Sequence, residues 1–391
     1  MMKILIIKNN NKNLMFSNPN FKFILSSLGI IGLNTFLTYI HAPNIPLIIS
    51  GLQSDPFIRS RNCIPLNNEK ISIFSGNANI QLSEKVAKDL GLTLSNSIST
   101  HYADGECNIR LLESVRGKDC YIIQPTSTPV NENLMELLLT IGTMRRANAK
   151  RITAVIPYYG YARADRKEKK LTPISAADVA KLLEAVGVDR CMCVDLHCGQ
   201  IQGFFEPSIA VDNLEAVPLM VNYLIRKKMV KDYNKLMIVS PDHGGVYRAK
   251  AFAQLLMKKT NAKNIGTTMI IKQRPRPNEV SRMDLVGDVR GNDCIIVDDM
   301  IDTGTTLCLA AKCLKDNGAE NVYCFATHGL FNGMAIEKIH NSVLTKVIVT
   351  DTIPPHKTKY SGKIKRISVA LLIAEAIRRI QNNESLTELY E

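Results

Sequence analysis

The sequence predicts an α/β protein made of two related domains, each a mostly parallel sheet flanked by helices. From residue 71 onward, short β-branched runs alternate with segments of helical periodicity, and the connections between them are short. The segment GKDCYII at Gly117 is echoed by GNDCIIV at Gly291, and each is followed by a turn and a helical pattern. The chain has 391 residues, of which 46% are hydrophobic, so it is long enough for two cores.

The elements follow one another in the same manner in both halves. In the first half we expect strands and helices alternately, at 70–76, 82–91, 120–126, 132–148, 151–158, 174–187 and 190–196. In the second half we expect them at 235–241, 244–259, 267–273, 294–300, 305–318, 321–327 and 346–352. Ligands of such sheets bind at the carboxyl ends of the strands, so functional residues are expected in the segments that follow the strands.

The predicted domain boundary lies near Asp212. It gives an N-terminal domain of residues 71–212 and a C-terminal domain of residues 213–391, which includes a C-terminal helix. In the echoed pair of segments, the first copy has Gln124-Pro125 where the second has two Asp residues. Two related halves, of which only the second kept an acidic site, account for this difference.

Residues 1–70 differ from the rest and are interpreted as a leader or a disordered extension. Residues 1–54 contain Lys but no Asp or Glu, and residues 21–40 are largely apolar. A basic leader without acids is typical of organelle targeting, while the apolar run also fits a signal-peptide core or a weak anchor. We expect a cytoplasmic enzyme by default, and a mitochondrial or plastid one if the leader is a targeting segment.

Composition narrows the classes of partner. The net charge of +13 suits an anionic partner such as a phosphorylated small molecule, a nucleic acid or an acidic membrane surface. Aromatic residues make up 6% and Trp is absent, which disfavours a stacking platform for single strands. The cysteines lack the spacing of a disulfide framework. Zinc binding by the group Cys191, Cys193, His197 and Cys198 is disfavoured, because CMCVDL alternates like a strand.

The stretch CIIVDDMIDTGTTLCLAAKCL carries the strongest chemical signal. Asp298 and Asp299 follow the strand residues Ile295 to Val297, and neighbours on a strand point to opposite sides. Asp302, Thr303, Gly304, Thr305 and Thr306 then lead into a helix. Backbone N–H groups and hydroxyls at a helix start form a phosphate site, whereas the carboxylates suit sugar hydroxyls or Mg²⁺. The string therefore predicts a sugar-phosphate site; an N-capped surface turn would explain only one of its residues.

This string resembles the ribose-phosphate-binding loop of type I phosphoribosyltransferases and of ribose-phosphate pyrophosphokinases, and it does not separate these families. Other stretches resemble the second family. They are HYADGE (101–106), IPYYGYARADRK (156–167), VDLHCGQIQGFF (194–205), VSPDHGGVYRAK (239–250) and IKQRPRPN (271–278). The resemblance runs from about residue 71 to the end. It implies phosphoribosyltransferase-like domains and Mg²⁺-dependent transfer of a diphosphoryl group from ATP to ribose 5-phosphate.

The resemblance also implies a role for each matching residue. Tyr102, Asp104, Glu106 and Arg163 would bind ATP, the first three of them from a neighbouring subunit. His197 and Asp242 would bind the metal. Asp298, Asp299 and Asp302 to Thr306 would bind ribose 5-phosphate. Lys272 and Arg274 would be catalytic, arriving on a loop that closes over the phosphates.

Three other functions stay open at this point. A phosphoribosyltransferase would share DDMIDTGTT but would not need the other stretches. A non-catalytic regulatory subunit would share the fold with eroded sites, and Ala164 stands where the family commonly has Gln. An RNA-binding regulator would use the positive charge. We expect ATP and ribose 5-phosphate as ligands, a homo-oligomer (a hexamer by resemblance), no nucleic acid, and no stable membrane insertion of the mature enzyme.

Overall fold

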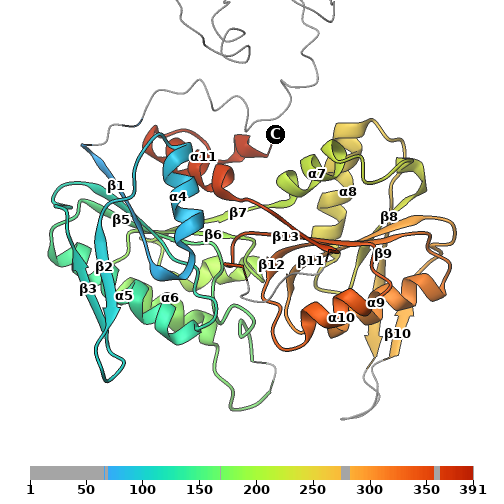
Figure 1. Cartoon of the computed structure of the whole chain (residues 1–391), viewed down its shortest axis with the longest axis horizontal. Helices are drawn as coiled ribbons and strands as arrows, with labels where there is room; N and C mark the ends of the chain where they lie inside the picture. Colours follow the sequence, from blue (N-terminus) through green and yellow to red (C-terminus); the bar gives the residue numbers. More distant parts are fainter. Residues whose placement is uncertain (1–65, 67–68, 168, 274–281, 356–361, 391) are drawn as a thin grey trace, which may run out of the picture. The chain divides into compact units, whose positions relative to one another are not determined.

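The computed structural model describes residues 66, 69–167, 169–273, 282–355 and 362–390, and gives only the backbone of residues 272, 273 and 282. Most of the predicted leader and the predicted catalytic residue Arg274 therefore lie outside the described residues. The fold class predicted from the sequence is confirmed: two sheets rich in parallel pairs follow one another along the chain, with helices on their faces (Figure 1).

The first sheet is entirely parallel, with its strands in the order β1-β4-β5-β6-β7. Its strands are β1 (Ile71–Ser75), β4 (Asp119–Ile123), β5 (Arg151–Ile156), β6 (Arg190–Val194) and β7 (Ala210–Leu214). Between β1 and β4 the chain forms a separate antiparallel hairpin of β2 (Ser97–His101) and β3 (Cys107–Leu111).

The second sheet has the order β10-β9-β8-β11-β12-β13-β14, and only the β9–β10 pair at its edge is antiparallel. Its strands are β8 (Leu236–Ser240), β9 (Gly266–Gln273), β10 (Arg282–Leu285), β11 (Asp293–Ile301), β12 (Val322–Gly329), β13 (Lys346–Thr350) and β14 (Ile364–Ile367). In each sheet the carboxyl ends of the parallel strands lie on the same side, so the loops that follow these strands can meet.

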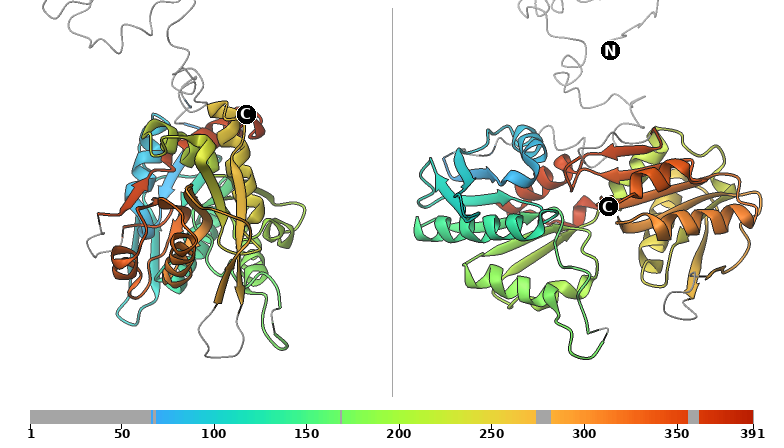
Figure 2. Two further views of the ribbon diagram at one scale, coloured as in Figure 1. Left: turned by 90° about the vertical axis from the view of Figure 1, so that its right-hand side faces the viewer. Right: turned by 60° about the horizontal axis from the view of Figure 1, so that its bottom comes forward.

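Helices cover both faces of each sheet (Figures 1 and 2). The α-helices are α4 (Ile80–Asp89), α5 (Val130–Arg146), α6 (Ser175–Ala185), α7 (Val217–Arg226), α8 (Val246–Thr260), α9 (Thr305–Asp316), α10 (Ala335–Asn341) and α11 (Ala370–Gln381). Short 3₁₀ turns are η2 (Asn77–Asn79), η3 (Gly199–Phe204), η4 (Tyr233–Lys235) and η5 (Thr387–Leu389).

The strands are apolar on both sides because each of their faces belongs to a core. On β4, Tyr121 and Ile123 join a core that also includes α4, α7, α8 and α11. Their neighbours Cys120 and Ile122 join a second core, with α5 and α6. Alternation along the strand sends successive side chains to opposite faces, so near-continuous apolar runs are the expected sequence of such buried strands. A third core lies under α9 and α10.

The internal echo corresponds to equivalent positions in the two sheets. Gly117 and Gly291 both adopt a left-handed φ, of 69° and 70°, immediately before strands β4 and β11. In the first copy, Gln124 is fully buried where the second copy has Asp298. Its side chain accepts a hydrogen bond from the Ala78 backbone at 3.1 Å and donates one to Glu136 at 2.6 Å. Protein groups therefore occupy the position after β4, whereas β11 carries two carboxylates at the equivalent positions.

Several elements differ from the sequence expectation. Strand β11 extends one residue beyond the expected 294–300 at each end, because its pairing with β8 begins at Asp293 and its pairing with β12 continues to Gly329. Patterning did not predict β2, β3, β7, β10, β14, α7 or α10. Asp212, near which we predicted the domain boundary, lies inside β7. The C-terminal helix α11 packs against α4, and Gln381 donates to the Tyr121 hydroxyl at 2.8 Å.

Candidate active site

His197 and Asp299 connect the two halves of the chain. His197 lies between β6 and η3, and Asp299 lies near the end of β11; His197 Nδ1 is 2.7 Å from Asp299 Oδ2. The hydrogen bond to Asp299 raises the pKa of His197. Burial alone would raise the pKa of Asp299, but the bond to His197 and the charge of Arg248 outweigh it and hold this pKa well below its usual range. The Asp299 carboxylate therefore accepts a hydrogen bond from Nδ1 of the His197 ring.

Asp298 and Asp299 differ in environment although they are adjacent. Burial and the neighbouring charge of Asp299 raise the pKa of Asp298 well above its usual value. Asp299 is only 5% exposed but keeps its charge, because the hydrogen bond from His197 and the charge of Arg248 stabilise its carboxylate. The backbone N–H of Asp299 donates to Asp298 Oδ1 at 2.9 Å, which fixes the first carboxylate against the strand. Two neighbouring carboxylates with separated proton affinities suit a ligand that carries both hydroxyl groups and a cation.

Arg248 is a site residue that the sequence reasoning did not identify. It lies in the first turn of α8, with its Nη1 atom 3.9 Å from Asp299 Oδ1, and its side chain is 19% exposed. The stretch VSPDHGGVYRAK contains it, but only Asp242 was assigned there. A basic residue in the first turn of a helix that follows an Asp at the end of a strand is a sequence signal that could have identified Arg248. Its charge offsets those of the nearby carboxylates.

Asp302 is held from both halves of the chain. Arg163 Nη1 lies 2.6 Å from Asp302 Oδ2, and Asn332 Nδ2 lies 2.7 Å from Asp302 Oδ1. Burial would raise the pKa of Asp302, but these hydrogen bonds outweigh it and lower the pKa. The sequence placed Arg163 and Asp302 in sites for different substrates. The structure brings these two residues into direct contact.

Gly304 makes the turn from β11 into α9. It is the N-cap residue of α9 with φ 70°, a left-handed conformation that glycine adopts without strain, and no side chain caps the helix here. Thr305 and Thr306 lie in the first turn of α9. Lys338, on α10, donates to Thr305 Oγ1 at 2.8 Å and lies 3.5 Å from the carbonyl oxygen of Thr303. Helix α9 therefore begins at Thr305, as the helical pattern of 305–318 predicted, and only Asp302 to Gly304 of the predicted phosphate loop precede it.

Asp242 lies in the loop between β8 and α8 and is exposed. Its Oδ1 accepts a hydrogen bond from the Gly245 backbone at 3.0 Å, which shapes the turn. Its charge helps to raise the pKa of Asp298, so it belongs to the same acidic cluster. Within the described residues, no group of three His, Cys, Asp or Glu side chains could hold a metal ion by itself. A cation bound here would need oxygen atoms from the substrates as well.

The remaining predicted residues lie at the edges of the site or beyond it. Lys272 lies in β9, where its backbone pairs with Met283 of β10, and Arg274 lies outside the described residues. Tyr102, Asp104 and Glu106 form the exposed tip of the β2–β3 hairpin, where Asp104 Oδ1 accepts a hydrogen bond from the Glu106 backbone at 3.1 Å. The hairpin packs on α5, and the first sheet lies between it and β11 (Figure 1).

A buried polar network lies behind His197. Asp195 adopts φ 42° at the turn after β6, and the Asp195 carbonyl oxygen lies 3.1 Å from His328 Nε2. His328 Nδ1 is 2.9 Å from the Thr352 hydroxyl, and Thr327 donates to the Asp195 carboxylate. The His328 ring also meets Tyr158 edge-on at 5.0 Å. This network links the loop that carries His197 to β12, and sequence patterning gave no signal for it.

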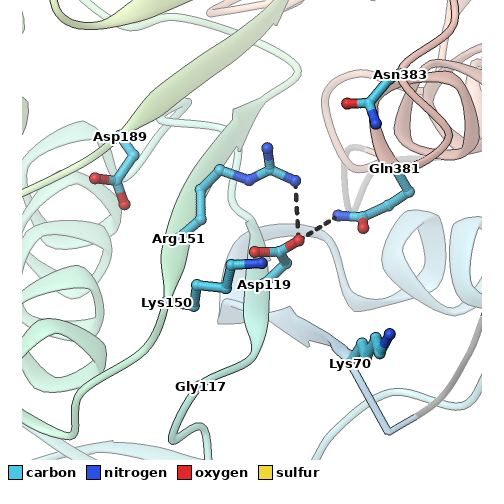
Figure 3. A pocket seen from close by; sticks show the side chains of 8 residues that line it. All are labelled: Lys70, Gly117, Asp119, Lys150, Arg151, Asp189, Gln381 and Asn383. Carbon is cyan, nitrogen blue, oxygen red and sulfur yellow. Dashed lines mark hydrogen bonds and ion pairs between the residues drawn. The ribbon is translucent and has the colours of Figure 1, made fainter.

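A cavity of about 610 Å³ lies at the amino ends of strands in the first sheet (Figure 3). Asp119 and Arg151, which begin β4 and β5, line it and pair at 2.9 Å; Gln381 also donates to Asp119, at 3.2 Å. These residues mark the amino ends of the strands. Because the predicted site residues follow the carboxyl ends, this cavity is not part of the candidate active site.

Comparisons with known proteins show to which family the chain is similar. Residues 71–187 match the N-terminal domain of ribose phosphate pyrophosphokinase, and residues 257–391 match the phosphoribosyl synthetase-associated domain. The chain is 46% identical over 323 residues to the ribose-phosphate pyrophosphokinase of Marinomonas sp., covering 82% of this chain and 99% of that protein. It is 47% identical over 320 residues to that of Aquifex aeolicus, with coverages of 82% and 99%.

A solved structure is similar over the same span. The phosphoribosylpyrophosphate synthetase from Mycobacterium smegmatis aligns with a TM-score of 0.74 and 38% identity, covering 80% of this chain and 99% of that one. Across the described residues, no helix is long and apolar enough to cross a membrane. At this identity over nearly the full length of its relatives, the chain belongs to the ribose-phosphate pyrophosphokinases, a family of transferases.

Proposed function

We propose that this protein transfers the β,γ-diphosphoryl group of ATP to the C1 hydroxyl of ribose 5-phosphate, giving 5-phosphoribosyl 1-diphosphate and AMP for nucleotide biosynthesis. The hydroxyl oxygen attacks the β-phosphorus, the bond between that phosphorus and the oxygen bridging to the α-phosphate breaks, and the hydroxyl proton is released. The observation that carries the proposal is the contact of His197 and Arg163 with Asp299 and Asp302. It makes the proposed nucleotide and sugar sites adjoin, as a direct transfer requires.

The acidic string would hold the sugar. Asp298 and Asp299 would orient the ribose through its hydroxyl groups, and Asp302 to Thr306 would hold its 5-phosphate at the start of α9. The left-handed Gly304 at the start of α9 supports this assignment, because the amino end of a helix favours an anion and glycine lets it approach closely. The carboxylates and the phosphate loop lie at different places along one segment. The sugar would therefore bind in one orientation, with its hydroxyl groups at the carboxylates and its phosphate at the loop.

ATP would lie on the side of the first half, with Arg163 as a contact to its phosphates. Its magnesium ion would be held by His197 and Asp242, and the Asp242 carboxylate supplies the oxygen donor that this hard cation prefers. The bond from His197 Nδ1 to Asp299 supports this role, because it would direct Nε2 toward the cation. When bound, magnesium would neutralise charge on the transferred phosphates.

Positioning and electrostatics would supply most of the catalysis. Lys272 and Arg274 would contact the diphosphoryl group only when their loop closes, so their charges would act on the transition state. Lys272 in β9, a neighbour of β8 in the sheet, supports this placement because Asp242 follows β8.

The active enzyme would be a homo-oligomer. Tyr102, Asp104 and Glu106 are exposed at the tip of the β2–β3 hairpin, which is separate from the first sheet. An exposed hairpin tip of this kind fits a contribution to the site of a neighbouring subunit. Family resemblance favours a hexamer.

One assay tests the proposed function. Purified protein is incubated with ATP, ribose 5-phosphate and magnesium, and AMP and 5-phosphoribosyl 1-diphosphate are measured. Equal amounts of both products support the proposal. AMP without the sugar product would overturn it, and a protein that binds both substrates without turnover would instead be a regulatory subunit.

A further inference from the structure

The segment after β12 backs the loop that we propose binds the 5-phosphate. The Asn332 backbone donates to the carbonyl oxygen of Asp302 at 3.1 Å, and the Asn332 side chain to its carboxylate at 2.7 Å. Ala335, the first residue of α10, lies against Gly304, where an added methyl group would come within 3.4 Å of the Ala335 carbonyl oxygen. The loop between β11 and α9 thus has a rigid support built from a later part of the chain.

Lys338 extends this support with a charge. Its Nζ lies 2.8 Å from Thr305 Oγ1 and 3.5 Å from the carbonyl oxygen of Thr303, so it spans the turn at Gly304. The side chain is exposed, and its ammonium group carries three donors. Two donors on the loop leave a third that can reach an oxygen of a ligand seated on the same turn.

Charge balance indicates why such a cation is needed. The loop from Asp302 to Thr306 contains one carboxylate and no cation. Arg163 already pairs with that carboxylate at 2.6 Å, so its charge is engaged. Among the described residues, the hydrogen bonds of Lys338 go to neutral oxygens. A phosphate bound only by N–H groups and hydroxyls would lack a full counter-charge, which Lys338 is placed to supply.

We propose that Lys338 is a binding residue for the phosphate group of the sugar and gives the site its selectivity for a phosphorylated substrate. The inference rests on the proposed function, because it takes the sugar phosphate to bind at the start of α9. Lys338 contacts the loop rather than the reacting atoms, so it should act on substrate binding and not on the chemical step.

Kinetics of Lys338→Met, Lys338→Arg and Lys312→Met test the inference. Lys312 is an exposed lysine of α9, so its replacement makes the same change of charge nearby. Lys338→Met should raise KM for ribose 5-phosphate about tenfold, the usual effect of one charge-assisted hydrogen bond, with kcat and KM for ATP nearly unchanged. Lys338→Arg should recover most of the loss, and Lys312→Met should behave as wild type. The defect should shrink as salt rises, because screening weakens the wild-type contact.

The alternatives give different results. If Lys338 only braces the loop, Lys338→Met lowers the melting temperature and changes kcat and both KM values together, which overturns the inference. Kinetics equal to those of Lys312→Met would overturn it as well. If the wild-type protein forms no sugar diphosphate, the proposed function fails instead. Calorimetry of ribose 5-phosphate binding to wild type and Lys338→Met then tests the role of Lys338 separately. A weaker affinity of the variant for ribose 5-phosphate supports this role, and an equal affinity refutes it.

Discussion

Asp299 and Thr306 are only seven positions apart in sequence but are expected to serve different parts of one substrate. Thr306→Val should weaken ribose 5-phosphate binding by about 1.5–3 kcal/mol, the value of a hydrogen bond to a charged group, and leave ATP binding nearly unchanged. Asp299→Asn should also impair the use of ribose 5-phosphate, with a stronger dependence on magnesium concentration, because a lost charge matters most to a cation. Calorimetry with each substrate separately measures both effects.

The structure adds a consequence for Asp299→Asn that Thr306→Val should not share. Asp299 holds His197 at 2.7 Å, so its replacement should also weaken binding of ATP with magnesium. Wild type and Thr306→Val serve as the matched controls for this second effect. If both variants lost ATP affinity and kept ribose 5-phosphate affinity, the string would be a nucleotide site and the proposed placement of substrates would be reversed.

The tautomer of His328 follows from its partners. A carbonyl oxygen can only accept, so Nε2, which lies 3.1 Å from the Asp195 carbonyl, carries the proton, and Nδ1 accepts from Thr352. Burial lowers the pKa of His328, and Arg248 lowers it further, against the opposing effects of Asp195 and Asp299. The neutral ring is therefore the form that joins the two halves.

This lowered pKa predicts a pH dependence of stability. Below about pH 6.5 the unfolded chain binds a proton at His328 more readily than the folded protein does. The free energy of unfolding therefore decreases as the pH is lowered. The contribution is at most about 1.4 kcal/mol per pH unit. His328→Gln lacks this titration, so the stability difference between wild type and variant should shrink from pH 7 to pH 5. Chemical denaturation at both pH values measures it; a difference that stays constant would contradict the assignment.

At the scale of elements, strand β11 and its neighbours determine where the charges lie. β11 stays paired with β12 through Ile301, so Asp298 and Asp299 lie on a strand and not on a free loop. The turn at Gly304 then reverses the chain into α9, and α10 supports that turn. Rigid elements on both sides of the acidic string suit a site that works by positioning.

The β9–β10 hairpin is the element from which we expect the catalytic cations. Lys272→Ala and Arg274→Ala should each lower kcat about a hundredfold, corresponding to about 3 kcal/mol, and raise either KM much less. Contacts made only after closure act on the transition state, so the loss appears in kcat. Steady-state kinetics with each substrate varied in turn measures this. A change confined to KM would mean ground-state binding and would refute the catalytic role.

At the scale of the whole molecule, the two halves share buried contacts as well as the site. Asn79 of the first half donates to the Asp351 carbonyl at 2.8 Å, and Lys85 pairs with the Asp351 carboxylate at 2.9 Å. The Asp351 carboxylate also accepts from the Val369 backbone at 2.8 Å, just before α11. Since α11 packs on α4, the C-terminal helix ties the second half of the chain to the first half.

The leader is expected to be dispensable, because no site motif lies in residues 1–70. A fragment of residues 70–391 should fold and turn over like the full chain, since it keeps the Lys70 carbonyl that accepts from Asp119. Leu66 packs at the border of the core, so a fragment of residues 66–391 is the matched control. Thermal melts and turnover compare them, and failure of both fragments to fold would refute the prediction. A fluorescent fusion of residues 1–70 tests separately for targeting.

Sequence alone determined the class of fold, the succession of its main elements and the positions of the chemical motifs. Apolar runs of strand length and amphipathic periods are local, so the alternation of β4, α5, β5, α6 and β6 could be predicted. The order of motifs such as DLHCGQ and DDMIDTGTT also predicted the family. The hairpin of β2 and β3 escaped prediction because its residues are polar and half-exposed, without a clear alternation.

Tertiary structure alone decided which of these motifs meet. His197 and Asp299 are 102 positions apart, and Arg163 and Asp302 are 139 apart, yet each pair is in contact. The roles of Arg248, His328 and Lys338 likewise depend on partners from other elements. Hydrophobic periodicity predicts which face of a strand is buried. It does not predict which charged side chains from other elements will contact the residues at the end of that strand. That choice follows from the packing of whole elements around shared cores, which fixes the site only once the chain is folded.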